Sequence, residues 1–379
     1  MTKGGIFYMN YSTDFNGWLG KIAADFTYEH VQKTMTALAK YYKENSTSGQ
    51  KLIIGYDTRF FAKEFAEFVA CIMAQNGVKV FLANRCASSS VLVVSALHKK
   101  SMGALTLTGD EHNAYHLGIR AFDAKGYSLT DQQIQSFMDQ KKSKKELETS
   151  LKKWISKGFI EPFDPSICYI QHIEQTIDFS SMVSTNRVLF NPMFGSAIHY
   201  FDHLLHEKGL RGYTIDREDP EAFRKIEPSP SLHTKQLYED MVFHGSDLGF
   251  IVSPDCTTFE FLIEPHQLTT KEKLVFLLEL FYEKGKSGQV LLSDTHHLIG
   301  SHPIKNHFTF THVPEENFQS SLASNSFILA VDSMGRFYFE HHGAPDALLC
   351  GFYFLEMLNN KELTPKTLHQ KLNRIKGVH

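Results

Sequence analysis

The chain has 379 residues, a length that favours roughly two to four domains because a single hydrophobic core seldom grows that large. Hydrophobic residues make up 42% and charged residues 21%, which is typical of globular proteins and argues against disorder. The net charge of −3 argues against a nucleic acid partner. Neither an apolar signal core nor a membrane-length apolar run is present, so we expect a soluble, cytoplasmic protein without membrane insertion.

The positions of the cysteines and histidines do not form a recognisable metal-binding motif. Five scattered cysteines without a C-x-x-C pair indicate reduced, mostly buried thiols. The pairs His296-His297 and His341-His342 are candidate metal ligands, but neighbouring residues on a strand point to opposite faces. Ordinary surface or core histidines are therefore the favoured interpretation.

Strand and helix signals alternate along the first 140 residues. The apolar runs 51–56, 78–83 and 103–108 predict strands, and apolar spacing predicts helices over 60–76 and 88–99. This alternation indicates right-handed crossovers and a largely parallel sheet covered on both faces.

The charged segment 141–153 follows, and we interpret it as a solvated connector helix. Two further blocks of alternating strands and helices begin near residues 165 and 269. The predicted elements of these blocks are strands 188–190, 213–215, 249–252, 290–292 and 327–331 and helices 197–208, 231–243, 270–284, 346–358 and 365–375.

Three apolar strands end in a loop that presents an aspartate: Asp110, Asp255 and Asp332. Ligands of open α/β sheets gather outside the carboxyl ends of strands, so these loops are candidates for one shared site. Aspartate is also common at strand ends and helix N-caps, which leaves an ordinary structural role open.

Several ordered motifs resemble one family. Residues 16–31 and 52–85, with their G-W-L-G and G-Y-D-T-R stretches, resemble the opening domain of the α-D-phosphohexomutases. These are the phosphoglucomutases, phosphomannomutases and phosphoglucosamine mutases. The segment NPMFGS (191–196) resembles the D-P-M-H-G-S motif of their second domain, and the similarity runs from about residue 12 to about residue 360.

The resemblance implies an α/β fold of three consecutive phosphohexomutase-like domains with mostly parallel mixed sheets. We expect a first domain at 1–150, a second at 151–265 and a third at 266–379 with a short C-terminal helix; the first boundary falls near 150–165 and the second near 262–269. Family members have a fourth domain with an R-x-S-G-T-E-P phosphate clamp. That motif does not occur in this sequence, so we expect no fourth domain.

The family's phosphoserine position aligns with Asp110, which Glu111 follows. A carboxylate cannot cycle between a hydroxyl and a phosphate ester as serine does. An acyl phosphate is conceivable, because aspartyl-phosphate enzymes exist. A permanent negative charge or a purely structural role for Asp110 fits the sequence better, so the resemblance leaves no conventional catalytic residue.

The family's Mg²⁺ loop, with three aspartates, aligns with residues 253–258 and keeps only Asp255 as a metal ligand. Ser253 and Thr257 stand in the other two ligand positions. Mg²⁺ prefers anionic oxygen ligands in octahedral geometry, so we expect weak Mg²⁺ binding at most and no other cofactor.

The family's sugar-binding loop aligns with residues 331–335, in which Asp332 and Ser333 are candidate ligand-binding residues. Arg59 and Arg120 are candidate phosphate ligands, although an ion pair within the domain explains Arg59 equally well. A cationic position of the opening motif is Leu19, so one phosphate contact is missing.

The sequence therefore favours a catalytically inactive phosphohexomutase-like protein, a pseudoenzyme that acts as a binding or structural component of a protein assembly. An unidentified protein partner and a sugar phosphate are the expected ligands. The alternatives are an active enzyme of the phosphoglucomutase and phosphomannomutase family, or a sugar-phosphate sensor in carbohydrate metabolism.

Overall fold

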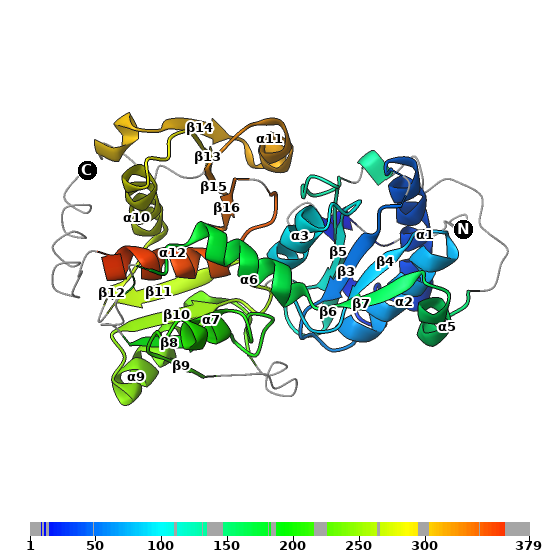
Figure 1. The fold of residues 1–379 in the computed structure, drawn as a ribbon, viewed down its shortest axis with the longest axis horizontal. Helices are drawn as coiled ribbons and strands as arrows, with labels where there is room; N and C mark the ends of the chain where they lie inside the picture. The colour runs from blue at the N-terminus through cyan, green and yellow to red at the C-terminus, as the bar shows by residue number, and fades with distance from the viewer. Residues whose placement is uncertain are drawn as a thin grey trace, which may run out of the picture. The chain divides into compact units, whose positions relative to one another are not determined.

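The computed structural model describes most of the chain. The described residues are 9, 11–12, 15–47, 49–109, 112–130, 132–134, 147–180, 182, 187–215, 226–263, 266–294, 303–340 and 342–360. The chain divides into two compact units (Figure 1): unit 1 comprises residues 1–169 and 220–226, and unit 2 comprises residues 170–219 and 227–379.

Unit 1 is built on a seven-stranded sheet with the strand order β1-β2-β6-β5-β3-β4-β7. The strands are β1 (Tyr11–Ser12), β2 (Gly17–Lys21), β3 (Leu52–Tyr56), β4 (Val80–Ala83), β5 (Ala104–Thr108), β6 (His116–Phe122) and β7 (Ile160–Phe163). The helices are α1 (Tyr28–Glu44), α2 (Ala62–Gln75), α3 (Ser89–His98) and α5 (Leu151–Ser156). Strands β5, β3, β4 and β7 are parallel, whereas β6, β2 and β1 extend the sheet in antiparallel fashion.

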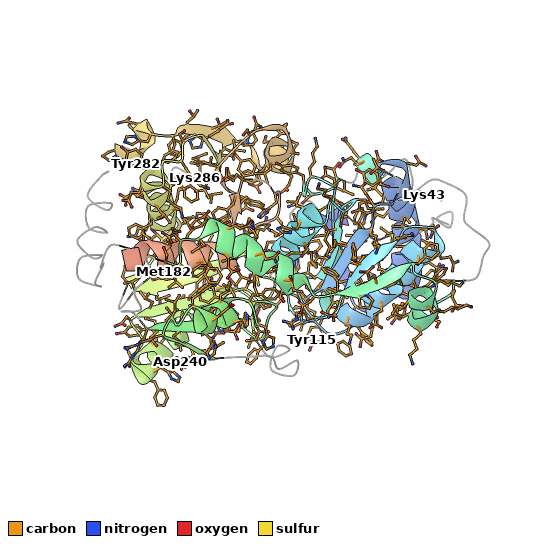
Figure 2. The ribbon with its side chains drawn as sticks, in the orientation of Figure 1. Lys43, Tyr115, Met182, Asp240, Tyr282 and Lys286 are labelled. Atoms are coloured by element: carbon orange, nitrogen blue, oxygen red, sulfur yellow. The ribbon has the colours of Figure 1, made fainter. Side chains whose placement is uncertain are left out.

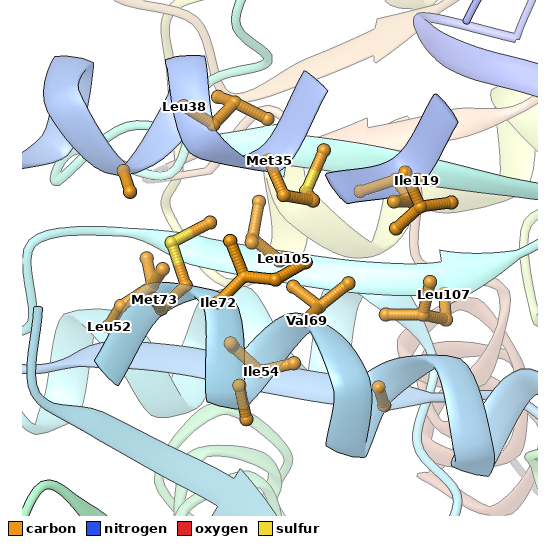
Figure 3. Packing of buried hydrophobic residues seen from close by; sticks show 14 of the residues in the cluster. Met35, Leu38, Leu52, Ile54, Val69, Ile72, Met73, Leu105, Leu107 and Ile119 are labelled. Atoms are coloured by element: carbon orange, nitrogen blue, oxygen red, sulfur yellow. The ribbon is translucent and has the colours of Figure 1, made fainter. Parts of the chain in front are cut away.

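Side-chain caps fix where two of these helices begin. The Thr27 hydroxyl accepts a hydrogen bond from the backbone N–H of His30, and Ser88 does the same for Val91. Apolar residues three and four positions apart then give each helix a buried face, as Val69, Ile72 and Met73 do on α2 (Figure 3).

Unit 2 contains two smaller sheets. The five-stranded sheet has the order β12-β11-β10-β8-β9, and the four-stranded sheet has the order β14-β13-β15-β16. The strands are β8 (Val188–Asn191), β9 (Gly212–Thr214), β10 (Leu248–Val252), β11 (Phe259–Ile263), β12 (His266–Gln267), β13 (Gln289–Ser293), β14 (Thr309–Val313), β15 (Leu329–Val331) and β16 (Phe337–Phe339). The helices are α7 (Phe201–Glu207), α9 (Thr234–His244), α10 (Thr270–Glu283), α11 (Phe318–Ser324) and α12 (Ala347–Asn360), with 3₁₀ turns at Pro230–His233, Pro303–Asn306 and Glu315–Asn317. Helix α6 (Pro165–Thr176) begins in unit 1 and ends in unit 2.

An aromatic core joins the two sheets of unit 2 through α12. The ring of Phe352 lies 4.5 Å from that of Phe201, and Phe354 stacks on Phe261 at 5.0 Å. Phe259 contacts both Phe354 and Phe337, and Phe337 belongs to the four-stranded sheet. Tyr353 of α12 contacts Phe339 of the four-stranded sheet at 5.4 Å, so both sheets pack against one shared helix.

The predicted α/β class and its mixed sheets are confirmed. Each sheet has parallel strands at its centre and antiparallel strands at one edge. The sequence patterns identified neither these antiparallel strands nor the parallel edge strands β7 and β14. Helix α7 begins at Phe201 rather than at residue 197, because His199, two residues before the helix, has a left-handed φ of 68°. The predicted helix 365–375, the segment 141–146 and residues 296, 297 and 341 lie outside the described residues.

The three-domain division stays a prediction. Helix α5 and strand β7 lie in unit 1, beyond the expected boundary at residue 150, because β7 pairs with β4 and extends the first sheet. The reduced cysteines are confirmed: all five are free, and four of them are buried. In the part of the chain that the structure describes, no helix is long and apolar enough to cross a membrane.

The core of unit 1 gives a direct test of this packing. Ile72→Ala should lower the free energy of unfolding of unit 1 by about 2–5 kcal/mol, because Ile72 is fully buried between α2 and the sheet. Ile155→Ala, at an exposed isoleucine of α5, is the matched control and should change it by about 0.5 kcal/mol or less. Both tryptophans of the chain, Trp18 and Trp154, lie in unit 1, so fluorescence during urea unfolding measures this unit. Equal effects of the two substitutions would contradict the packing described.

Candidate functional site

The candidate site loops follow strands β5, β10 and β15. Asp110 and Glu111, which follow β5, lie outside the described residues. Asp255 and Asp332 are described, and both are buried, with exposed fractions of 2% and 1%. The loop after β10 and the loop after β15 belong to unit 2.

The Asp255 carboxylate is surrounded by donors from its own loop. Its Oδ1 accepts hydrogen bonds from the hydroxyls of Ser253 at 2.8 Å and Thr257 at 3.0 Å, and from the backbone N–H of Thr257 at 3.3 Å. The Ser253 hydroxyl oxygen in turn accepts the backbone N–H groups of Thr257 and Thr258, at 3.1 and 3.0 Å. The two hydroxyls that stand where the family has aspartates therefore act as hydrogen-bond donors to the remaining carboxylate.

This donor set does not fit Mg²⁺. A magnesium site needs several anionic or carbonyl oxygens with lone pairs directed at the ion, whereas the Ser253 and Thr257 hydroxyls direct their protons at Asp255. Among the residues that the structure describes, no group of three or more His, Cys, Asp and Glu side chains could hold a metal ion. No step that depends on a metal follows from this loop.

The N-P-M-F-G-S segment packs directly against the Asp255 loop. The backbone N–H and the hydroxyl of Ser196 both donate to the carbonyl oxygen of Pro254, at 2.7 and 2.8 Å. A Cβ on Gly195 would lie 2.2 Å from the Pro254 Cα, so only glycine allows the two loops to cross this closely. The Asn191 side chain accepts the Met193 N–H at 2.7 Å and fixes the start of the turn.

Asp332 is held in a network of its own loop. Its carboxylate forms an ion pair with the Arg336 side chain at 2.5 Å and accepts the Tyr338 hydroxyl at 2.9 Å. The Arg336 N–H and the Met334 N–H also donate to it. A sugar hydroxyl would have to compete with these donors, and the sugar-binding role of Asp332 stays a prediction.

Beside it, the loop is connected to Glu315, which the sequence analysis missed. One carboxylate oxygen of Glu315 accepts the Ser333 N–H at 3.3 Å and the Ser293 hydroxyl at 2.9 Å. Glu315 lies in a 3₁₀ turn far from the motif in sequence, so no local pattern could have identified it. The structure thus brings Ser333 and Glu315 together, and the ligand role of Ser333 stays a prediction.

Arg59 is buried and bonded within unit 1. Its guanidinium pairs with Asp57 at 3.2 Å and donates to the carbonyl oxygens of His112 and Asn113, at 2.6 and 2.9 Å. Burial raises the pKa of Asp57 above its usual value, and the Arg59 charge offsets part of that rise. These bonds connect the loop after β5 to the end of β3. The ion pair with Asp57 is the alternative role that the sequence analysis gave for Arg59, and a phosphate contact by Arg59 stays a prediction.

Arg120 is likewise internal. Its Nε donates to the Phe15 carbonyl oxygen at 2.9 Å, and its guanidinium lies 4.7 Å from the centre of the Phe15 ring. With 3% of its surface exposed, Arg120 anchors the segment before β2. Its role as a phosphate ligand also stays a prediction.

A positive cluster that the sequence analysis missed lies where β2 and β6 meet. Lys21 pairs in register with His116 across the two strands, and the rings of His112 and His116 are 5.5 Å apart. Partial burial lowers the pKa of His116, the charges of His112, Arg59 and Lys21 lower it further, and the Asp25 carboxylate opposes them. Lys21 is two residues after Leu19 on the same strand, so it shares a strand face with the position where the family motif has a cation. Tyr115, exposed at the surface of the same loop, is labelled in Figure 2.

Comparison with known proteins finds a likeness to phosphoglucomutases in part of the chain. Residues 13–148 match the family model described as phosphoglucomutase/phosphomannomutase, alpha/beta/alpha domain I. A phosphoglucomutase of Staphylococcus saprophyticus is 23% identical over 202 residues, which are 50% of this chain and 35% of the relative. A phosphoglucomutase of Staphylococcus aureus is 21% identical over 190 residues, 49% of this chain and 34% of the relative. The chain thus spans about a third of the length of the curated relatives it matches.

Solved structures extend the likeness over nearly the whole chain. A putative phosphomannomutase of Thermus thermophilus superposes with a TM-score of 0.81 at 18% identity, covering 97% of this chain and 84% of that one. The phosphoglucomutase parafusin of Paramecium gives 0.77 at 15% identity, covering 97% and 74%. Residues 13–148 therefore match a domain I of this class, and nearly the whole chain shares the fold of these two solved structures.

The metal loop can be tested by restoring its carboxylates. The unmodified chain should bind Mg²⁺ no tighter than about millimolar, because Asp255 is the only carboxylate of the loop. The double variant Ser253→Asp with Thr257→Asp should melt at a lower temperature without Mg²⁺, since it buries two more charges, and should be stabilised by Mg²⁺ through mass action.

The matched control carries asparagine at both positions and should not respond to Mg²⁺. Calorimetry would show both effects. A micromolar Mg²⁺ site in the unmodified chain that disappears in Asp255→Ala would overturn this description.

Proposed function

We propose that this chain binds hexose phosphates as a member of the phosphohexomutase superfamily and does not perform Mg²⁺-assisted phosphoryl transfer. The names of its relatives support the substrate class: they are phosphoglucomutases and phosphomannomutases. Since the chain spans about a third of the curated relatives, their whole activity does not transfer to it with the fold.

The observation that carries the second half of the proposal is the hydrogen bonding of Asp255. Phosphoryl transfer depends on positioning and on stabilising the charge of the transferred group, which a metal ion supplies when it is bound. In this loop Ser253 and Thr257 add no negative charge, and their hydroxyls donate hydrogen bonds to one oxygen of the Asp255 carboxylate. A single carboxylate with these donors offers Mg²⁺ much less charge than a loop of three aspartates.

The positive cluster of Lys21, His112 and His116 supports the binding half. Burial and, to a smaller extent, positive neighbours lower the pKa of His116, and a bound phosphate dianion would oppose both effects and favour protonated histidine. The cluster lies beside the loop after β5, which corresponds to the phosphoserine loop in the resemblance. A phosphate held there needs no metal.

An active phosphoglucomutase or phosphomannomutase is the second candidate. The comparisons favour it, because the relatives named here carry enzyme names. It requires phosphoryl transfer without a serine at position 110, where this chain has aspartate, and without a metal loop of three aspartates. A role as a binding or structural component of a protein assembly, and a cytoplasmic location, also remain proposals.

An activity assay separates the two candidates. The purified chain should interconvert neither glucose nor mannose phosphates above background, with or without a bisphosphate activator and Mg²⁺. Asp110→Ser alone should also be inactive, because the metal loop keeps one carboxylate and transition-state contacts act together. Turnover in the unmodified chain that Asp110→Ala abolishes would establish the enzyme and reject our proposal.

Binding is tested separately by thermal unfolding followed through tryptophan fluorescence. Glucose 1-phosphate or mannose 1-phosphate at about ten times its Kd should stabilise the chain by about 1.4 kcal/mol through mass action. Lys21→Gln should weaken binding about tenfold, whereas Lys43→Gln, at an exposed lysine of α1 (Figure 2), should leave it unchanged. No stabilisation by either sugar phosphate, or equal loss in both variants, would contradict the binding half.

A further inference from the structure

A surface pocket of about 390 Å³ lies in unit 1 on residues that take no part in the loops above. It opens between the start of α1, the outer face of α2 and the segment before α5. Its lining residues are Tyr28, Glu64, Glu67, Phe68, Thr149 and Leu151. Aromatic and acidic side chains therefore meet in one hollow.

The aromatic wall of the pocket consists of Tyr28 and Phe68, and packing against neighbouring rings holds it in place. The Tyr28 ring stacks on Phe65 at 4.6 Å and meets Phe68 edge-on at 4.8 Å. Phe65 is 3% exposed and anchors this group in the core, whereas Tyr28 is 49% exposed. A ligand would find a ring face already held in place, which lowers the entropy lost on binding.

The aromatic wall continues outside the pocket. Phe60 and Phe61 are 46% and 37% exposed and lie 4.1 Å apart, and Phe61 contacts Phe65. We name Tyr28, Phe60, Phe61 and Phe68 the aromatic surface. Exposed rings gathered in this way are typical of protein interfaces rather than of free surface.

The backbone of Phe61 supports this interpretation. Its φ is 63°, in the left-handed region that a bulky residue adopts only at a cost. The position directly before α2 holds the Phe61 ring at the surface beside Phe60 instead of in the core. Local strain of this kind is retained mainly at functional sites.

Charge identifies what the pocket accepts. Glu64 and Glu67 lie three residues apart on α2, on the same side of the helix. Neither carboxylate forms an ion pair with any residue in the described ranges. Two carboxylates beside aromatic ring faces complement an organic cation.

We propose that this pocket binds an arginine side chain of a partner protein, with apolar neighbours of that arginine lying on the aromatic surface. A guanidinium group is planar, stacks on an aromatic ring and donates to two carboxylates at once. Ammonium is compact and strongly hydrated, so lysine fits this arrangement less well. The inference does not depend on hexose phosphate binding.

The test uses the full chain and the capped peptide acetyl-Leu-Arg-Leu-amide in a calorimetric titration. The arginine peptide should bind about threefold tighter than its lysine analogue and about tenfold tighter than its glutamine analogue. Glu64→Gln with Glu67→Gln should weaken binding about tenfold. Glu44→Gln, at an exposed acid of α1 outside the pocket, is the matched control and should leave binding unchanged.

A second variant keeps the proposal decidable if aromatic truncation disturbs the fold. Tyr28→Leu keeps apolar volume over Phe65 and should remove the preference for arginine over lysine, because it removes the ring face. Equal binding of the three peptides, no binding, or loss in Glu44→Gln as well would overturn the proposal. If the chain instead dimerises in solution and the Glu64 and Glu67 substitutions abolish the dimer, the occupant is a second copy and the proposal is wrong.

Discussion

Buried carboxylates at strand ends must find their donors inside the protein, and this constraint shapes each described loop of the candidate site. Asp57, Asp255 and Asp332 are each at most 2% exposed. Each has donors within a few residues: Arg59 pairs with Asp57, two hydroxyls donate to Oδ1 of Asp255, and Arg336 pairs with Asp332. Because an unpaired buried charge is very costly, these local donors are a condition for the loops to exist as they are.

The strands could be predicted from the sequence only in part. Apolar runs such as 51–56 and 249–252 are continuous, which identified the central parallel strands. The edge strand β7 contains a proline and two exposed residues among four, so its pattern resembles a loop. Pairing with β4, a non-local contact, makes it a strand.

The candidate residues show the same limit. Sequence motifs located Arg59 and Asp332 correctly at strand ends, but motif spacing does not say which way a side chain faces. Whether Arg59 bonds to backbone carbonyls or to a ligand depends on where the fold places residues 112 and 113, which are distant in sequence. The contact of Glu315 with Ser333 and the pairing of Lys21 with His116 also join residues distant in sequence, so no local pattern signals them.

The helix shared by the two sheets of unit 2 has a consequence for how that unit folds. Helix α12 comes last of the described elements, yet its phenylalanines complete the cores of sheets that begin far earlier in the chain. Until α12 has been synthesised, the rings of Phe201 and Phe261 have Phe250 beside them but lack the rings of Phe352 and Phe354 that complete their packing. The two sheets should therefore reach their full stability together and late, whereas the described helices and strands of unit 1 lie within its first 169 residues and precede this helix in the chain.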